Sequence, residues 1–582
     1  MKKILIIFIL IANLVLPQAV KAASGIWCAG DSEKIKPNDP AQEKNFFWDD
    51  ATKTVKLHGA KNEYVAFQII INASGERLLN INVKPDDFKS LNSVIGKENI
   101  DLFKEHYLNV TVPSSADAKP VEDAETGEYP TQMVPFYAPK GGAPFNVENN
   151  RNQPVWVDVY IPENAAAGEY ESYFTITAEG KGPLKIKVLL TVWNFMLPHK
   201  THFRTYIYYG SEQIQWAYGY NDSGSAEFRS LEDKFFQMAH QHRLNLCPNI
   251  EMEWGYDRFD KYWYERGRGK YIDGSAYTQK VGKGTPANTW VMLIDGFDHK
   301  PEYQRLCKVT LGYFSKKNLA DILMLYVADE PASKENYGFI RERCQWVHEA
   351  VGKQLPRMVT VGIKPPSLLW PSLVGYVDIW NSGASLWSDM QKRMKAGDKI
   401  WTYNMGWGGG PYVDTPGISG RTQGWIAWKF GFDGWHFWDS CYWLDTNNFR
   451  NKDGKRINMD QIRANTDKYS TNVWENPMTF DQMRRPGYLA QDALRLNGDG
   501  VLFYPGAYVG LQEPISSFIM KSLRRGLQDY EYLLLAKKLG REKQIQPIVD
   551  SIIPEPKKWN KDFSAWYEAR VKIAREILSA LE

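Results

Sequence analysis

Two adjacent carboxylates, Asp329 and Glu330, follow the apolar run Leu323-Met-Leu-Tyr-Val-Ala328, and Pro331 comes directly after them. The run predicts a buried strand that ends at the pair. Two carboxyl groups in one pocket separate their pKa values, so that one stays protonated as an acid while the other is ionised. Glycosidic bonds are commonly cleaved by such a pair, with one acid and one nucleophile or stabiliser.

The adjacency of the two acids leaves two interpretations open. In a regular strand, consecutive side chains point to opposite faces, so Asp329 and Glu330 reach one cleft only where the strand ends. Pro331 favours such an end, because it removes a ladder donor and is expected to hold Glu330 in an extended conformation. Alternatively, the run Asp-Glu-Pro-Ala-Ser caps the following helix and places negative charge at its positive end.

Polar residues also end other predicted strands in the middle of the chain. They are Glu251, Glu253, Asn381, Tyr403, Asn404 and Asp439. Tryptophans flank these positions, namely Trp254, Trp380, Trp401, Trp407, Trp435 and Trp438. In an α/β barrel the chemistry lies at the C-terminal ends of the strands, so this recurrence predicts one shared site with aromatic walls. Packing in the core is the competing interpretation for the aromatic residues.

Other catalytic and metal-binding patterns are absent from the sequence. It contains no His-Glu-x-x-His motif and no Gly-x-Ser-x-Gly elbow. His240 and His242 are two residues apart and would diverge on a helix. Asp445-Thr-Asn447 resembles part of a calcium loop, but Arg450 stands where such a loop needs glycine. We therefore expect no metal and no cofactor, and carboxylate chemistry remains.

The elements that must position the acid pair lie in residues 199–510, where predicted strands and helices alternate. Strands are expected at residues 203–209, 244–254, 322–328, 358–363, 374–380, 399–405, 434–438 and 500–504. Helices are expected at 227–240 and 336–351, and residues 255–290 resemble an insertion. Repeated strand–helix units predict a (β/α)8 TIM-like barrel. An open doubly wound sheet is the runner-up, although no Gly-rich phosphate loop follows the first strand.

The two ends of the chain predict a flanking domain and a helical completion of the barrel. Residues 23–198 contain several short alternating strands with turn signals, which predict an N-terminal β-sandwich. We interpret it as a structural buttress, with carbohydrate binding as the alternative, and expect a long loop at 109–150. Residues 511–582 predict helices at 514–540 and 562–581. The charged residues Arg524, Arg525, Asp529 and Glu531 form an ion-pair network or touch substrate, and we favour the network.

Composition and the first residues indicate an exported protein. Residues 1–22 resemble a cleavable signal peptide, with Lys2 and Lys3 before an apolar core at 4–16. We expect a periplasmic or secreted location and no membrane span. With 71 Lys and Arg against 68 Asp and Glu, the charge balance gives no indication of nucleic-acid binding. The five cysteines lie far apart, which leaves the formation of a disulfide open, and the oligomeric state is also open.

Several segments resemble glycoside hydrolase family 123 and the larger related group known as domain of unknown function 4091. Tyr-Val-Ala-Asp-Glu-Pro331 resembles the family's Asp-Glu motif. Asn62-Glu-Tyr-Val-Ala-Phe-Gln68 and Val155-Trp-Val-Asp-Val-Tyr-Ile-Pro162 with Ala167-Gly-Glu-Tyr170 resemble its sandwich domain. Gly500-Val-Leu-Phe-Tyr-Pro-Gly506 and Ser522-Leu-Arg-Arg-Gly-Leu-Gln-Asp-Tyr-Glu-Tyr532 resemble its C-terminal signature. These segments occur in the expected order over most of the chain.

The resemblance implies a β-N-acetylgalactosaminidase that acts on a glycan substrate by substrate-assisted, retaining catalysis. Asp329 would then orient the substrate's 2-acetamido group, and Glu330 would protonate the leaving oxygen. The further candidates for substrate contact are Tyr403, for the acetamido oxygen, Asn381, for a hydroxyl, Trp407 and Trp438, as pocket walls, and Asp439.

Two alternatives to this interpretation stay open at the level of the sequence. The segment Trp435-His-Phe-Trp-Asp-Ser-Cys-Tyr-Trp443 matches the family's aromatic strand only loosely, which leaves the sugar specificity open. A glycosidase of the same fold could act on a different sugar. A non-catalytic glycan-binding protein of a polysaccharide-uptake system is the alternative from another functional class.

Overall fold

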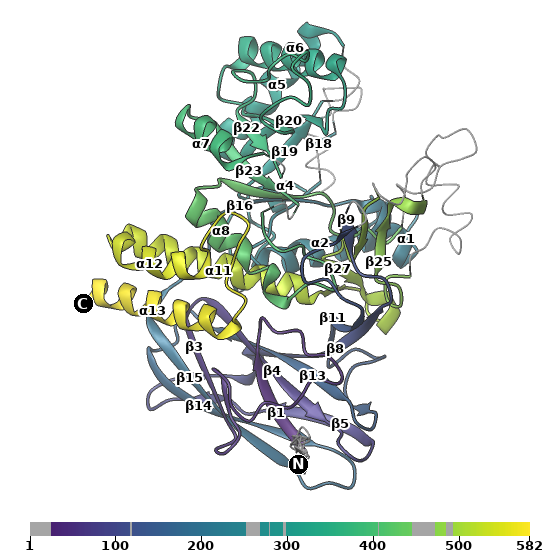
Figure 1. The fold of residues 1–582 in the computed structure, drawn as a ribbon, viewed down its shortest axis with the longest axis vertical. Coiled ribbons are helices and arrows are strands. Elements are labelled where there is room, and N and C mark those ends of the chain that lie inside the picture. Colours follow the sequence, from purple (N-terminus) through teal and green to yellow (C-terminus); the bar gives the residue numbers. More distant parts are fainter. Residues whose placement is uncertain are drawn as a thin grey trace, which may run out of the picture.

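The computed structural model shows a β-sandwich below an α/β barrel, with the C-terminal helices alongside both (Figure 1). It describes residues 25–116, 119–248, 250–251, 268–278, 280–294, 298–383, 385–404, 407–444, 472–484 and 493–582. The predicted signal peptide at 1–22 and the calcium-like segment at 445–447 lie outside these ranges. The predicted multidomain architecture, a sandwich followed by a TIM-like barrel, is confirmed.

Two sheets make up the N-terminal sandwich. The first contains, in spatial order, β1 (Gly25–Gly30), β4 (Glu63–Asn72), β13 (Asn152–Ile161), β8 (Ile100–Val110) and β11 (Gly127–Pro135). The second follows the order β12 (Phe145–Val147), β5 (Leu78–Pro85), β14 (Gly168–Thr177), β15 (Leu184–Met196), β3 (Thr54–Lys61) and β2 (Trp48–Asp49), with β6 (Phe88–Lys89) and β7 (Val94–Ile95) beside it. Alternating apolar residues of both sheets, such as Val65, Phe67, Val188 and Leu190, are buried between them.

The long loop predicted at 109–150 is wrong in part. Residues 127–135 form β11, which pairs antiparallel with β8, and residues 145–147 form β12. Only the part around β9 (Ser115–Ala116) and β10 (Lys119–Pro120) leaves the sandwich, and β9 pairs with β26 (Arg495–Asn497) beyond the barrel strands. The polar and glycine-rich composition of this stretch correctly indicates its turns, but it gives no sign of the strands between them.

The barrel is built from parallel strands that follow one another around the sheet. In chain order they are β16 (Arg204–Tyr208), β17 (Leu246–Cys247), β18 (Ile250–Glu251), β19 (Trp290–Leu293), β20 (Leu323–Asp329), β21 (Arg357–Thr360), β22 (Ile379–Asn381), β23 (Lys399–Tyr403) and β24 (Gly434–Phe437). β17 and β18 are two parts of one strand, interrupted at Pro248, and they pair with β16 and β19 respectively. Because the sheet begins and ends in this interrupted strand, eight strands close the barrel.

Two strand predictions for the barrel are wrong. The barrel strand that was not predicted is β19, which begins at the last residue of the stretch 255–290 interpreted as an insertion, and its four residues are too few to show a period. The predicted strand at 500–504 is not part of the barrel. Instead β27 (Phe503–Pro505) forms an antiparallel pair with β28 (Pro514–Ser516). Another antiparallel pair, β25 (Met478–Asp481) with β26, precedes it in the chain.

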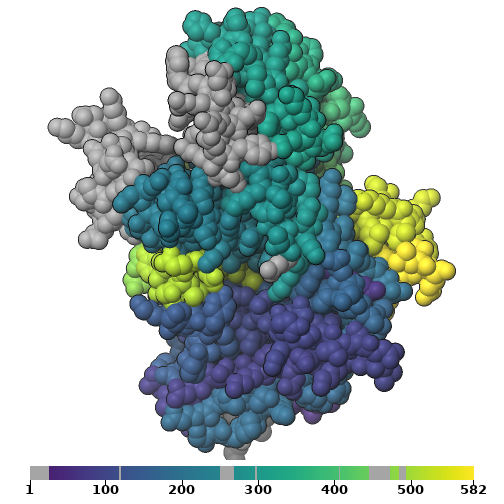
Figure 2. All heavy atoms as spheres, turned by 180° about the vertical axis from the view of Figure 1, so that it is seen from behind, coloured from purple at the N-terminus to yellow at the C-terminus, as the bar shows by residue number. Residues whose placement is uncertain are grey.

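Helices connect the barrel strands and complete the C-terminal end of the chain. They are α1 (Ser211–Tyr218), α2 (Ala226–Gln241), α4 (Gly269–Ile272), α5 (Lys300–Lys316), α6 (Lys334–Val351), α7 (Trp387–Lys395), α8 (Thr422–Phe430), α11 (Phe518–Lys538), α12 (Glu542–Ile552) and α13 (Phe563–Leu581). α11 packs against α8 of the barrel, β11 of the sandwich and α13. In Figure 2 the yellow-green part of the chain near residue 500 lies between the blue sandwich and the teal barrel.

A buried network of ion pairs holds the three parts together. Arg525 of α11 reaches Glu63 of the sandwich at 3.1 Å, and Asp529 of α11 binds Arg421, just before α8, at 2.6 Å. Arg570 of α13 pairs with both Glu63 and Asp529. Although burial alone would raise the pKa of Asp529, the guanidinium groups of Arg421 and Arg570 hold it below the ordinary value. Arg525 and Asp529 therefore act as a structural network, as favoured from the sequence.

The described residues also bear on the predicted absence of a membrane span and on the cysteines. No helix in the described residues is long and apolar enough to cross a membrane. All five cysteines are described, buried and unpaired. Burial also raises the pKa of each thiol, with Cys28 and Cys441 among the most strongly affected, so these side chains pack as small apolar groups.

Candidate active site

The acid pair stands where β20 stops. Asp329 is the last residue of the strand, as predicted, and Glu330 follows it with φ = 39°. The expectation that Pro331 holds Glu330 in an extended conformation is wrong, because this φ lies in the left-handed region. A residue other than glycine rarely adopts that conformation, and such strain is concentrated at functional sites. The reversal of the backbone releases Glu330 from the strict alternation of a strand.

The prediction that the run Asp-Glu-Pro-Ala-Ser caps the following helix is confirmed for its serine but not for the two acids. α6 begins at Lys334, and its N-cap is Ser333, whose Oγ accepts a hydrogen bond from the Asn336 N–H at 3.1 Å. The cap is thus supplied four residues after Asp329, by the serine of the same run. Both acids thus lie outside the helix, and Glu330, but not Asp329, is among the residues that line the adjoining cleft.

A cleft of about 540 Å³ opens at the C-terminal ends of neighbouring barrel strands. The lining includes Glu330, Pro331, Tyr337, Thr360, Val361, Gly362, Lys364, Pro366, Asn381, Ser382, Gly383, Ser385, Leu386, Asp389 and Tyr403. These residues come from the ends of β20, β21, β22 and β23 and from the segments that follow them. Three of the residues predicted from the sequence, Glu330, Asn381 and Tyr403, meet here, at the end of the barrel where chemistry is expected.

Glu330 is placed to act as an acid. Partial burial raises its pKa, and the neighbouring charge of Asp329 raises it further, while a hydrogen bond from the Tyr403 hydroxyl opposes the shift. Burial and the two carboxylates raise the pKa of Tyr403 far above the ordinary value, so this phenol keeps its proton. The site therefore holds a carboxyl that retains its proton to a higher pH than usual, next to a fixed donor.

A β-bulge in β20 brings a side chain of the same strand into hydrogen-bonding contact with Asp329. The register between β20 and β21 shifts between Tyr326 and Ala328, so Val327 is an extra residue on β20. Residues three apart in a regular strand lie on opposite faces, but after this bulge the Tyr326 hydroxyl donates to Asp329 Oδ1 at 2.6 Å. Thr360, which stands opposite Asp329 in the register, forms a short hydrogen bond with the same hydroxyl.

The hydrogen bonds that lead to Asp329 form a chain in which each group donates to the next. Asn381 Nδ2 donates to Thr360 Oγ1 at 3.1 Å and to His436 Nδ1 at 2.6 Å. Burial lowers the pKa of His436 to about 3, so the ring is neutral and Nδ1 can accept. Thr360 then donates to Tyr326, and Tyr326 donates to the carboxylate. The final acceptor is Asp329, and these hydrogen bonds hold its Oδ1 in place.

Only Asn381 of this group was predicted from the sequence. Thr360 and His436 carry no signal of their own, since they meet only through the register of β21 to β24. Tyr326 lies inside the strand quoted above, but its contact with Asp329 depends on the bulge. Asn381 was expected to bind a hydroxyl group. Its amide nitrogen is used within the protein, whereas its Oδ1 has no hydrogen-bond partner among the described residues.

Trp407, Trp438 and Asp439 lie outside the lining of this cleft. Trp407 is only 1% exposed and packs against aromatic rings of the core, Trp387, Phe430 and Phe432. Trp438 is half-buried and donates from Nε1 to Asp499 at 3.1 Å. Asp439 accepts the backbone N–H groups of Ser440 and Cys441, and its burial raises its pKa to about 7. For Trp407, the competing interpretation of core packing describes the observed position.

The candidates Glu253 and Trp254, and residues 405–406 after β23, lie outside the described ranges. Within the described ranges, no group of three or more His, Cys, Asp or Glu side chains could hold a metal ion.

Comparison with protein families and solved structures gives a consistent result. The model described as the glycoside hydrolase 123 catalytic domain matches residues 233–536, and that of the glycoside hydrolase 123 N-terminal domain matches residues 41–178. The structure of a family 123 glycoside hydrolase from Clostridium perfringens, described in connection with glycolipid glycan hydrolysis, is similar over 96% of this chain and 100% of its own. With a TM-score of 0.65 and 12% identity, this likeness shows a shared fold.

The likeness to other solved structures is weaker. A GH5 xyloglucanase from Bacteroides ovatus aligns with 72% of this chain and 98% of its own, but the identity is 9% and the TM-score of 0.24 carries no argument. No curated protein matches the chain.

Proposed function

This chain belongs to glycoside hydrolase family 123, and from that premise we propose that it releases β-linked N-acetylhexosamine, N-acetylgalactosamine in particular, with retention of configuration. The observation that carries the proposal is the pair at the end of β20, where a carboxyl with a raised pKa, Glu330, stands next to the oriented carboxylate Asp329. The two acids thus have different environments, and each suits a different task.

In the first step the leaving group departs with a proton from Glu330. The glycosidic oxygen takes that proton as its bond to the anomeric carbon breaks, and the acetamido oxygen of the same sugar forms the new bond to that carbon. The product is an oxazolinium ion and a free alcohol. Asp329 accepts a hydrogen bond from the acetamido N–H and stabilises the positive charge that develops there.

In the second step water opens the oxazolinium ion. Glu330, now ionised, takes a proton from water while the water oxygen attacks the anomeric carbon, and the bond to the acetamido oxygen breaks. Two displacements at one carbon retain its configuration, and Glu330 regains its proton. Tyr403, which donates to Glu330 in the free enzyme, is the proposed donor to the acetamido oxygen, and Asn381 Oδ1 is the proposed acceptor for a sugar hydroxyl.

The natural substrate and the location follow as parts of the same proposal. The Clostridium perfringens structure is described in terms of glycolipid glycans, and such glycans are our first candidates for the substrate. The charged and apolar pattern of residues 1–22 supports export to the periplasm or the medium.

A panel of aryl β-glycosides tests the reaction. We expect turnover of the N-acetylgalactosamine substrate, loss of that turnover in Glu330→Gln and a strong reduction in Asp329→Asn. Turnover only of sugars without a 2-acetamido group would overturn substrate assistance. Binding of glycans without turnover of any of them would favour the non-catalytic glycan-binding alternative.

A further inference from the structure

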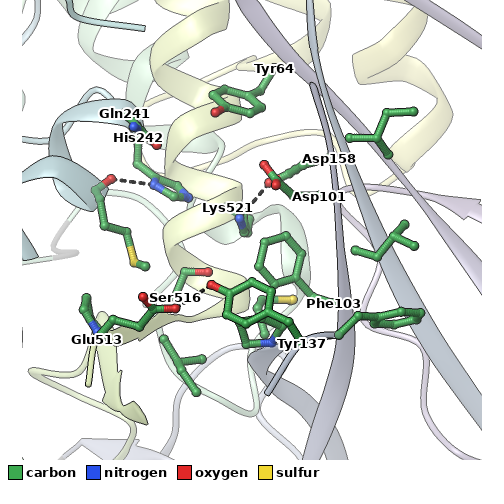
Figure 3. Close-up of a pocket in the computed structure, with 18 of the residues that line it drawn as sticks. Tyr64, Asp101, Phe103, Tyr137, Asp158, Gln241, His242, Glu513, Ser516 and Lys521 are labelled. Atoms are coloured by element: carbon green, nitrogen blue, oxygen red, sulfur yellow. Dashed lines mark hydrogen bonds and ion pairs between the residues drawn. The ribbon is translucent and has the colours of Figure 1, made fainter. Parts of the chain in front are cut away.

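A second large cavity lies between the sandwich and the helices that face it. Its volume is about 550 Å³, within the range of roughly 300–1,000 Å³ that is usual for ligand pockets. The walls come from β8, β11 and β13 of the sandwich, from α2, and from the segment of β28 and α11 (Figure 3). It shares no lining residue with the catalytic cleft.

One buried polar atom in this cavity has no partner. His242, 5% exposed, donates from Nδ1 to the carbonyl of Met238 at 2.7 Å, while Nε2 has no hydrogen-bond partner among the described residues. Burial, together with the charges of Lys521 and Arg524, lowers the pKa of the ring, so His242 is neutral and Nε2 carries a lone pair. Figure 3 shows this side of the ring facing Lys521. A group that satisfies Nε2 must therefore donate a hydrogen bond.

Lys521 supplies the opposite function at the same place. Its ammonium donates to Asp158 Oδ2 at 2.7 Å and lies 4.3 Å from the ring centroid of Phe103. An ammonium has three N–H groups, and Asp158 uses one of them. Arg524 also binds Asp158, so the carboxylate is already paired. The inner end of the cavity thus combines a donor, Lys521, with an acceptor, His242 Nε2.

The mouth of the cavity offers an aromatic ring. Tyr137, in the turn after β11, is 70% exposed, and its hydroxyl donates to Glu513 Oε1 at 2.5 Å. This contact joins the sandwich to the segment before β28 and holds the ring beside the opening (Figure 3). Gln241 and Ser516 add uncharged polar groups to the lining. Exposed aromatic rings pack well against the C–H faces of sugar rings.

We propose that this cavity is a second, non-catalytic binding site for a neutral sugar residue of a glycan. A hydroxyl group can donate to His242 Nε2 and accept from Lys521 at once, whereas an anion without a proton cannot satisfy the histidine. The acids at the mouth, Asp101 and Glu513, are paired with Lys280 and Lys234, so the lining offers no excess positive charge to attract an anion. An apolar ligand would leave both polar groups unpaired.

Given the proposed glycan substrate, the second site binds part of that substrate away from the cleft. A glycan chain bound at two places on one protein dissociates more slowly than one bound at a single place, because the second contact is intramolecular. The sandwich then has a part in binding through its inner edge, in addition to its role as a buttress.

Saturation-transfer NMR with the methyl glycosides of glucose, galactose, mannose, N-acetylglucosamine and N-acetylgalactosamine tests the site. We expect at least one of them to bind wild-type protein and to lose affinity roughly tenfold in Tyr137→Ala and in His242→Leu. The matched control is Tyr173→Ala, because Tyr173 is also an exposed tyrosine on the sandwich whose hydroxyl donates to a glutamate. It should leave binding unchanged.

The turnover of an aryl glycoside separates this proposal from the proposed reaction. Tyr137→Ala should keep the wild-type kcat/KM on a small substrate, since it does not touch the catalytic cleft. If every sugar binds Tyr137→Ala as tightly as wild type, or if none binds at all, the second site is overturned. The NMR measurement needs no turnover, so it stays decisive if the proposed reaction is wrong. The exposed position of Tyr137 keeps the test valid should His242→Leu fail to fold.

Discussion

Carboxylates occur in two contrasting settings in this molecule, at the interface between its parts and at the cleft of the candidate active site. At the interface, Asp529 is held by Arg421 and Arg570, and Asp158 by Lys521 and Arg524. These cations hold the pKa of both carboxyls below the ordinary value despite burial. In the cleft, Glu330 has another acid and a phenol as neighbours, and its pKa is raised.

The difference shows how one side-chain type serves two purposes. A buried carboxylate surrounded by cations is fixed in its charged form and contributes to the free energy of unfolding, provided that its partners remain. A carboxyl beside a second acid holds its proton longer and can give it away, which is what a general acid needs. The backbone differs in the same sense, because Asp158 and Asp529 lie inside regular elements, whereas Glu330 has a left-handed φ.

The largest change in kcat is expected when the proposed proton donor, Glu330, is replaced. Glu330→Gln keeps the shape of the side chain but cannot transfer a proton, so kcat on an aryl N-acetylgalactosaminide should fall by about 10³-fold. The melting temperature should stay close to that of wild type, because no ion pair is lost. Steady-state kinetics and thermal unfolding measure the two quantities. A variant within tenfold of wild type would show that Glu330 is not the acid.

At the interface, a substitution is expected to lower stability strongly and to leave kcat unchanged. Asp529→Ala leaves Arg421 and Arg570 buried without their partner, which should lower the free energy of unfolding by about 3 kcal/mol. The control is Glu171→Gln, which removes an exposed pair with Lys187 and should cost less than about 1 kcal/mol. Denaturant unfolding gives both values, and kcat of the folded protein should be unchanged. Equal losses in the two variants would contradict the structural role of the network.

A smaller effect should follow from the support of Asp329. Tyr326→Phe removes the hydroxyl that donates to Oδ1, and kcat should fall roughly tenfold with little change in KM, as expected for a group that orients a catalytic one. Thr360→Ser keeps the hydroxyl next in line and should remain close to wild type, whereas Thr360→Ala should resemble Tyr326→Phe. Wild-type kcat in Tyr326→Phe would remove this network from the mechanism.

The two settings also predict pH limits on opposite sides. Because the pKa of Glu330 is raised, kcat/KM should persist above pH ~4.3, the ordinary value for glutamate, and fall as the pH passes the higher value in the folded protein. The pKa of Asp158 and Asp529 is lowered, so their stabilisation is complete above pH ~3.9 and is lost as the pH falls through the folded-state values. A pH–rate profile and acid unfolding should show these limits. If activity and stability were lost in the same pH range, the predicted difference between the two settings would be contradicted.

The sequence predicts the general architecture well because its patterns are local. Alternating strands in the first third, the strand–helix alternation and the apolar run ending at Asp329 all arise from short-range periodicity. The strand β19 escaped prediction because four residues show no period, and residues 500–504 were assigned to the barrel because an antiparallel hairpin strand looks the same in isolation.

The details of the cleft depend on long-range geometry and could not be predicted. The bulge at Val327, the left-handed Glu330 and the register that brings Thr360 and His436 behind Asp329 leave no trace in composition or spacing. For Trp407 the sequence misled in another way. Its position next to a strand end predicted a pocket wall, but its side chain is buried in the core. Short patterns locate strand ends but do not tell which side chains turn inward.

The most direct test of the account is a series of aryl N-acetylgalactosaminides whose acetamido methyl group carries none, one, two or three fluorine atoms. Fluorine withdraws electrons from the acetamido oxygen and weakens it as a nucleophile without changing the rest of the sugar. If that oxygen forms the bond to the anomeric carbon beside Asp329, kcat/KM should fall stepwise with each fluorine. A rate that is independent of fluorine content would contradict the account, because the attack would then come from another group.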